Sequence, residues 1–172
     1  MNYDIVKIAV LSDTHSWIDD RIIDYLKNAD EIWHAGDIGS LEVLDRLEQL
    51  PGKLRAVHGN IDNQQIKLAA PEYLSFSINN MRVLITHIAG NPPRYNTNVR
   101  KLLHEHRPNI LVCGHSHILK VTNDKRSDLL FINPGACSHH GFHKVRTLIQ
   151  FQIINDKPQK MIVIELGKRG KR

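Results

Sequence analysis

Short apolar runs alternate with segments of helical apolar spacing along the first third of the chain. The runs cover residues 5–12, 31–34 and 53–57, and their composition is that of buried strands. Between them, apolar residues recur every three or four positions over residues 17–28 and 41–50, which predicts helices. The resulting order β-α-β-α-β favours a parallel sheet with right-handed crossovers.

Strands dominate the pattern beyond residue 71. Two apolar runs flank Asn79-Asn80, a two-residue link typical of a hairpin. Residues 98–106 show helical spacing, which stops at Arg107-Pro108. The expected strands of this half are residues 73–78, 81–86, 110–113, 118–122, 129–132, 147–154 and 160–166. This pattern fits two sheets packed face to face with helices outside, in one domain covering residues 1–172.

The composition is that of a soluble domain. The chain has 172 residues, of which 41% are hydrophobic and 24% charged, and this length can bury a proper core. Charged residues interrupt the first apolar run, so no signal peptide is expected, and no segment reaches the ~20 apolar residues that span a bilayer. Two cysteines make no disulfide framework, so a cytoplasmic location is expected.

The formal net charge of +5 comes partly from a basic tail, residues 168–172. Such a tail is typical of a solvated, frayed terminus. Weak attraction to nucleic acid is the alternative, but aromatic residues make up only 6% of the chain and do not interleave with the basic ones. Specific binding of nucleic acid or of a membrane is therefore not expected.

Metal-capable side chains stand where five of the apolar runs stop. They are Asp13, His15, Asp37, Asn60, His87, His115 and His117. Ligands of open α/β sheets gather outside the carboxyl ends of the strands, so these side chains are expected to converge. Carboxylate, amide and imidazole donors without a thiolate favour Mn²⁺, Fe, Zn²⁺ or Ni²⁺ over Ca²⁺ or a structural zinc.

Spacing within the loops supports a metal site. Asp13 and His15 lie two apart, as do His115 and His117, and side chains at that spacing leave the same face of the chain. Glycine directly precedes three of the candidates and lets the backbone turn sharply beneath a crowded site. Each motif alone has an ordinary explanation, because Asp-x-His arises by chance and Gly-Asp or Gly-Asn is commonly a turn. Their occurrence together, all at strand ends, favours the metal site.

From Lys7 to Glu165 the chain resembles the calcineurin-like metallophosphoesterases, in particular their small single-domain phosphodiesterases and the related scaffold subunit of retromer. The resemblance includes the segment Ile132-Asn133-Pro134-Gly135, which is typical of that small branch. It implies an α/β fold, namely a four-layer αββα sandwich of two mixed sheets. It also implies two metal sites, one formed by Asp13, His15, Asp37 and His117 and the other by Asp37, Asn60, His87 and His115.

The same resemblance implies a divalent-metal-dependent phosphoesterase, and more narrowly a phosphodiesterase acting on a small phosphoester. In such enzymes a hydroxide that bridges two ions, here expected to be Mn²⁺, attacks phosphorus in line. Asp37, Asn60 and His87 are the expected catalytic residues, with Asp37 as the bridging ligand. A scaffold or binding protein of little or no activity, as in retromer, is the alternative.

Two positions depart from the wider family. Larger members carry a histidine directly after Gly-Asn that helps to protonate the leaving group, and this chain has Ile61 there. Ile88-Ala89-Gly90 replaces the Gly-His that often follows the histidine at position 87. The next residue after Ile61, Asp62, is expected to be a loop residue or a residue that supports a metal ligand, and it could serve as a modest acid. These changes predict slow turnover, or a preference for esters with good leaving groups.

Further histidines and one arginine surround the candidates. His34 and His58 lie near ligand-bearing strand ends, where they could orient a metal ligand. The histidine-rich segment 139–143 is expected either to line the pocket mouth, with His140 contacting substrate, or to form a solvated loop. Arg94 is a candidate contact for the substrate phosphate.

Overall fold

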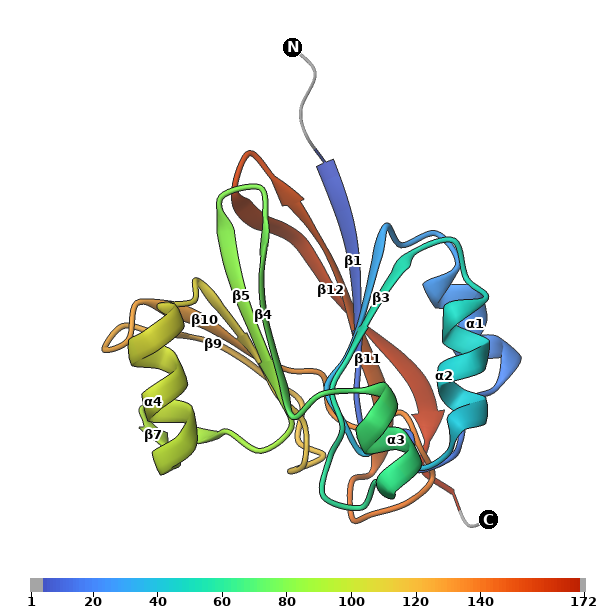
Figure 1. Ribbon diagram of the computed structural model, residues 1–172. Coiled ribbons are helices and arrows are strands. Elements are labelled where there is room, and N and C mark those ends of the chain that lie inside the picture. The colour runs from blue at the N-terminus through green and yellow to red at the C-terminus, as the bar shows by residue number, and fades with distance from the viewer. Residues whose placement is uncertain (1–4, 171–172) are drawn as a thin grey trace.

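Two five-stranded sheets pack face to face in the computed structural model, which describes residues 5–170 (Figure 1). The first sheet has the order β12 (Lys157–Lys168), β11 (Val145–Ile154), β1 (Ile5–Leu11), β2 (Glu31–His34) and β3 (Lys53–Ala56). The second has the order β4 (Tyr73–Ile78), β5 (Met81–Thr86), β8 (Ile110–Val112), β10 (Leu129–Asn133) and β9 (Lys120–Asp124). Outside the sheets are α1 (Asp20–Leu26), α2 (Leu41–Glu48), α3 (Gln64–Ala69), α4 (Thr97–His106) and a short hairpin of β6 (Gly90–Asn91) and β7 (Arg94–Tyr95).

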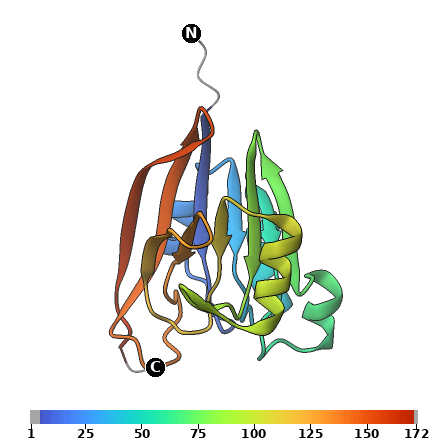
Figure 2. The same cartoon turned by 90° about the vertical axis from the view of Figure 1, so that its left-hand side faces the viewer.

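Helices cover the outer faces of both sheets. Helices α1 and α2 lie on the first sheet, and α4 lies on the second, where Figure 2 shows it in front of the strands. Both sheets are mixed, because parallel and antiparallel pairs occur in each. The predicted αββα sandwich is confirmed.

Strand β1 shows why its sequence is apolar without alternation. Ile8 and Val10 point into the core between the two sheets, whereas Ala9 and Leu11 point into the core beneath α1 and α2. All four side chains are at most 1% exposed. A strand that is buried on both faces needs a continuous apolar run, and each fully buried Ile, Val or Leu contributes roughly 1.5–3 kcal/mol.

Capping residues set the helix bounds more tightly than apolar spacing does. The helix predicted at residues 17–28 is shorter, Asp20–Leu26, because the Asp19 side chain accepts a hydrogen bond from Ile22 N at 2.9 Å and starts it there. Helix α4 begins in the same way at Asn96 and ends at Arg107, whose left-handed backbone precedes a proline.

Helix α3 and the bounds of two strands differ from the sequence prediction. Helix α3 was not predicted, because its only buried residue is Ile66 and it rests mainly on the Asn63 cap. The strand expected at 118–122 is β9, Lys120–Asp124, and the strand expected at 160–166 extends over Lys157–Lys168. Strand pairing therefore reaches the first residue of the basic tail expected to fray, while residues 171–172 lie outside the described part.

The strand directions bring several loops to one end of the molecule. Strands β1, β2 and β3 are mutually parallel, as are β5, β8 and β10. In Figure 1 the loops that follow these strands gather at the lower end, beside α3. The five expected ligand segments follow β1, β2, β3, β5 and β8, so the fold itself brings them together. Within residues 5–170, no helix has the length and apolar character needed to cross a membrane.

Candidate metal centre

The seven predicted ligands lie together at the carboxyl ends of the parallel strands. Two groups of three place potential ligand atoms within 4.8 Å of one another: Asp13 with His15 and His117, and Asp13 with Asp37 and His87. All seven side chains take part in the contacts described below, which is the convergence that the strand-end pattern predicts.

One half of the cluster contains two imidazoles and two carboxylates. His117 Nε2 lies 3.2 Å from Asp13 Oδ1, and His15 Nε2 lies 3.6 Å from Asp37 Oδ2. The two Nε2 atoms of His15 and His117 are 3.4 Å apart. Two ligand atoms on one tetrahedral ion at about 2.1 Å lie about 3.4 Å from each other. These separations therefore fit a shared divalent ion.

The other half is built around an amide oxygen. Asn60 Oδ1 lies 3.1 Å from His87 Nε2 and 2.8 Å from His115 Nδ1. His87 Nε2 also lies 3.1 Å from Asp37 Oδ1. The donor set of one carboxylate, one amide and two imidazoles suits the same borderline ions as the first half.

Asp37 belongs to both halves. Its Oδ2 faces His15 and its Oδ1 faces His87, so the two carboxylate oxygens point in different directions. Burial alone would raise the pKa of Asp37, but the hydrogen bond and charge of His87 and the N–H of Ile61 lower the pKa below its ordinary value. The carboxylate is thus held ionised between two groups of metal-capable donors.

Hydrogen bonds on the far side of two imidazoles fix which nitrogen faces the cluster. His87 Nδ1 lies 2.7 Å from Ala35 O, and because a carbonyl only accepts, this nitrogen carries the hydrogen. His143 Nε2 likewise donates to Ser138 O at 3.0 Å, so His143 Nδ1 is free to accept from His117 Nδ1 at 3.3 Å. In both ligands Nε2 is then the ring nitrogen that faces the cluster and that would bind an ion, as in metal-bound histidines.

The loops that carry the ligands have an unusual backbone. Five of the seven residues have left-handed backbone angles: Asp13 (φ 54°), His15 (φ 45°), Asp37 (φ 52°), His115 (φ 68°) and His117 (φ 57°). A residue other than glycine in this region costs of order 1–3 kcal/mol and persists where its surroundings enforce it. Such strain gathers at functional sites, which marks these loops as more than turns.

Glycines leave room for the ligand side chains. A Cβ at Gly36 would lie 2.6 Å from His87 Nδ1, and one at Gly114 would lie 2.7 Å from Asp13 Oδ2. A Cβ at Gly59 would collide with the carboxylate of Asp37. The glycines therefore serve close approach between loops as much as sharp turns.

Asp62 joins two of the ligand loops. Its buried carboxylate accepts from Gly59 N at 2.7 Å, from Gly39 N at 2.7 Å and from Ile38 N at 3.1 Å. These donors flank Asn60 on one loop and Asp37 on the other. These contacts favour a loop-supporting role for Asp62 over that of a modest acid, since both oxygens accept from the backbone. In the sequence, the one sign of this role was the presence of an acidic residue two positions after Gly59-Asn60.

His34 is buried behind the loops and is not a ligand candidate. Its Nδ1 accepts from Gly36 N at 3.2 Å, and its Nε2 lies 2.9 Å from Thr14 Oγ1. Burial lowers the pKa of His34 to about 4, so the imidazole is neutral. It supports the loops after β1 and β2, the orienting role considered for it. His58 Nδ1 instead lies 3.3 Å from the neighbouring Gly59 O, and no hydrogen bond joins His58 to a ligand side chain within residues 5–170.

The two predicted substrate contacts lie in different places. The His140 ring stacks on the His15 ring with centroids 4.4 Å apart, and it lines the cleft that opens over the cluster. Arg94 lies in β7 and lines neither of the two clefts that adjoin the cluster. The expectation that Arg94 contacts a phosphate there gains no support from this position.

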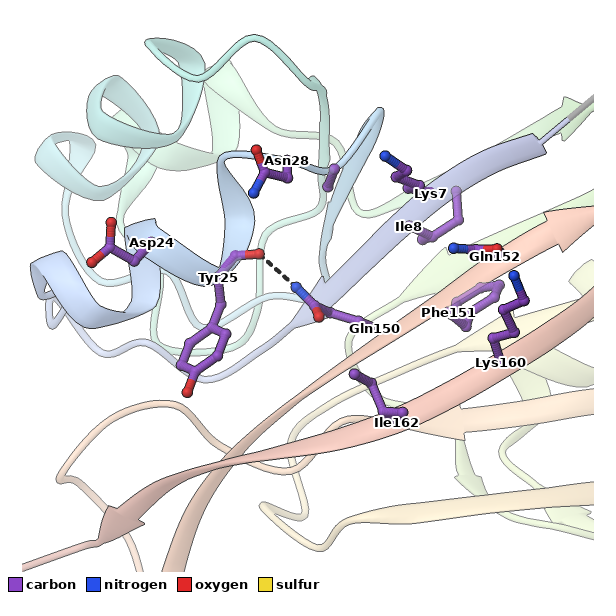
Figure 3. A pocket seen from close by; sticks show the side chains of 11 residues that line it. Lys7, Ile8, Asp24, Tyr25, Asn28, Gln150, Phe151, Gln152, Lys160 and Ile162 are labelled. Carbon is purple, nitrogen blue, oxygen red and sulfur yellow. Dashed lines mark hydrogen bonds between the residues drawn. The ribbon is translucent and has the colours of Figure 1, made fainter.

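A third cleft lies away from the cluster, between α1 and strands β1, β11 and β12 (Figure 3). It has a volume of about 290 Å³, and in it Gln150 Nε2 donates to Tyr25 O at 2.5 Å. None of its lining residues is a predicted ligand. Among residues 5–170, the groups of side chains that could hold a metal lie at the strand ends.

A double-sheet α/β sandwich with carboxylate, amide and imidazole donors gathered at its strand ends is the architecture of a metallophosphoesterase. The sequence model of the calcineurin-like phosphoesterase superfamily domain matches residues 6–156. The chain belongs to this superfamily.

Known relatives agree with this assignment. A probable metallophosphoesterase of Methanocaldococcus jannaschii is 33% identical over 135 residues, which are 75% of this chain and 67% of the relative. Among solved structures, an archaeal phosphodiesterase superposes with a TM-score of 0.75 at 23% identity, covering 93% of this chain and 99% of the other. Vps29 of Chaetomium thermophilum superposes with a TM-score of 0.72 at 14% identity, covering 95% and 99%. The two structural likenesses concern the fold.

Proposed function

We propose that this chain is a phosphodiesterase that works with two divalent metal ions in a single domain. The observation that carries the proposal is the placement of Asp37, whose two carboxylate oxygens face two separate sets of donors. In this proposal Asp13, His15 and His117 share one ion with Asp37, and Asn60, His87 and His115 share the other. When bound, two such ions supply positive charge for the phosphate oxygens and activate water for attack near neutral pH.

The residues of the chain provide order rather than proton transfer. Hydrogen bonds to Ala35 O and to His143 hold His87 and His117 in one ring orientation, and Asp62 fixes the loops of Asp37 and Asn60. A site that is ordered before the substrate binds avoids the cost of reorganising during the reaction. The proposed catalytic residues Asp37, Asn60 and His87 all lie within this framework.

The preference for good leaving groups follows from Ile61. This side chain is 46% exposed and lines the cleft beside Asn60, but it has no proton to give. Departure of an alkoxide needs protonation far more than departure of a nitrophenolate does. The enzyme is therefore expected to hydrolyse aryl esters much faster than alkyl esters.

Mn²⁺ is the proposed ion, with Fe, Zn²⁺ and Ni²⁺ as the other candidates. A donor set of carboxylate, amide oxygen and imidazole accepts all of them. Both cysteines are buried and unpaired, which suits the reducing cytoplasm that we propose as the compartment. The proposed partner is a small phosphoester.

The proposal is tested by hydrolysis of bis-p-nitrophenyl phosphate. Protein stripped with chelator should be inactive, and added Mn²⁺ should restore nitrophenol release. Asp37→Asn should abolish the restored activity, whereas Asp45→Asn, at an exposed position of α2, should retain it. If none of the four metals supports turnover, the proposal is contradicted.

A scaffold function is the second candidate, favoured by Ile61 and by the likeness of the fold to Vps29. A scaffold needs its surface but not its metal ligands. If Asp37→Asn leaves the biological function of the chain intact while metal binding is lost, the scaffold function is favoured. If the function is lost with the metal, the enzyme is favoured.

A further inference from the structure

Two clefts flank the candidate metal centre and meet at Asn60, which lines both. The first, here called the apolar cleft, has a volume of about 450 Å³ and carries Ile61, Ile118 and Phe142 on its rim. The second, here called the polar cleft, has a volume of about 340 Å³ and extends from His87 towards α3 and α4. A phosphate held at the centre thus has space on two sides.

The rim of the apolar cleft is exposed without any evident structural reason. Phe142 is fully exposed, Ile118 is 65% exposed and Ile61 is 46% exposed. All three come from different loops, after β10, β8 and β3, yet they surround one opening. Clustered exposed apolar side chains commonly mark a binding surface.

The floor and charge of the apolar cleft restrict what it can hold. Its floor is formed by candidate ligands, including His15, Asp37 and His115. None of the described residues that line it is a lysine or an arginine, and its titratable members are Asp37 and histidines, so a second phosphate group would find no permanently cationic side chain there. A neutral apolar group next to the scissile phosphate fits this composition.

The polar cleft differs by its charged side chains, although Ile88, Val99 and Leu102 also line it. Lys67 and Glu72 line it together with Tyr73 and Asn98, so charged, phenol and amide groups are available. Such a wall suits a group that forms hydrogen bonds. The two sides of the centre are therefore chemically different.

We propose that the substrate is an unsymmetrical phosphodiester whose apolar, aryl or alkyl arm lies in the apolar cleft and whose polar arm lies in the other. This inference rests on the proposed function and deepens it, because a monoester would leave one cleft unused. Phe142 and Ile118 are then residues that determine specificity. Continuity of the rim with the metal ligands favours a substrate arm over a protein partner.

Binding of a phosphonate series measures the apolar cleft without turnover. The probes are methyl-, butyl-, hexyl- and phenylphosphonate, titrated calorimetrically into Mn²⁺-loaded protein, with inorganic phosphate as the reference. Affinity should rise along the series by up to about fourfold per buried methylene. Inorganic phosphate should bind more weakly than butylphosphonate.

Two variants locate the effect. In Phe142→Ser, the affinity should no longer rise along the phosphonate series, while the affinity for inorganic phosphate should stay unchanged. Leu68→Ser is the matched control, since Leu68 is 80% exposed on α3 and lines neither cleft. It should retain the full dependence on chain length.

The outcomes separate this inference from the proposed function. If inorganic phosphate binds and bis-p-nitrophenyl phosphate is hydrolysed, but all phosphonates bind alike, the apolar arm is contradicted and the phosphodiesterase stands. If affinity still rises along the phosphonate series in Phe142→Ser, the proposed role of the rim is contradicted as well. If neither phosphate nor phosphonates bind, the proposed function itself fails.

Discussion

His143 and His117 face each other through their Nδ1 atoms at 3.3 Å, although 26 positions separate them in the chain. His143 donates its other ring hydrogen to Ser138 O, so it can only accept from His117. The pair thereby leaves Nε2 as the nitrogen with which His117 faces Asp13 and His15. A histidine outside the proposed ligand set thus determines the tautomer of one inside it.

Replacing His143 by alanine should weaken Mn²⁺ binding about 10- to 100-fold, because His117 loses the partner that orients it. His143→Asn, whose side-chain oxygen can accept from His117, should recover part of the loss. The affinity is measured by calorimetric titration, alongside the melting temperature. His139→Ala is the control from the same loop, and equal losses in both variants would assign the effect to the loop instead.

Gly59→Ala should disrupt the centre, because a Cβ there would collide with both the side chain and the backbone nitrogen of Asp37. The collision arises although the backbone at Gly59 is not left-handed. Mn²⁺ affinity should therefore fall strongly. Gly167→Ala is the control, since its φ of 103° makes alanine strained but only Arg21 lies nearby, at 3.8 Å. It should lower stability and leave Mn²⁺ affinity unchanged, and the reverse pattern would refute the account.

Asp62→Asn should destabilise the protein by about 2–3 kcal/mol. An amide cannot accept all three backbone N–H groups that the carboxylate accepts, and its own N–H₂ would face one of them. Urea unfolding of the metal-free protein measures the change. A variant of unchanged stability whose turnover is lost at low pH, where a carboxylic acid would hold its proton, would favour Asp62 as an acid.

Metal-free protein should lose stability as the pH falls from about 6.5 towards 4. Burial lowers the pKa of His34 to about 4, whereas an unfolded histidine has a pKa of about 6.5, so within this window the unfolded state binds the extra proton. The loss approaches about 3 kcal/mol and levels off below pH 4. The raised pKa of His87 acts in the opposite sense, so the test is the difference in urea stability between wild type and His34→Gln. A difference independent of pH would contradict this assignment.

Most strands could be predicted from the sequence, because strands buried on both faces require apolar runs such as that of β1. Helix α3 could not, since a single buried residue and the Asn63 cap leave no periodic signal. The seven candidate ligands were visible because parallel strands bring their carboxyl ends together. The contact of His143 with His117 and the two-loop role of Asp62 were hidden, since both depend on distances between loops that no local pattern encodes.

The rim of the apolar cleft could not be predicted from the sequence either. Ile61 attracted notice in the sequence only as a missing proton donor, and Ile118 and Phe142 did not stand out. The structure brings the three to one rim. Arg94 was a candidate phosphate contact because it is a basic residue shortly after His87. It instead lies in the β6–β7 hairpin.

The central claim is that Asp37 joins two ion sites, and the stoichiometry of Mn²⁺ binding tests it most directly. Calorimetric titration of chelator-treated protein should find two ions per chain. Asp37→Asn should weaken both binding events, because each oxygen of this carboxylate faces a different donor set. A saturated stoichiometry of one or zero, or an Asp37→Asn variant that still binds two ions with wild-type affinity, would contradict the account.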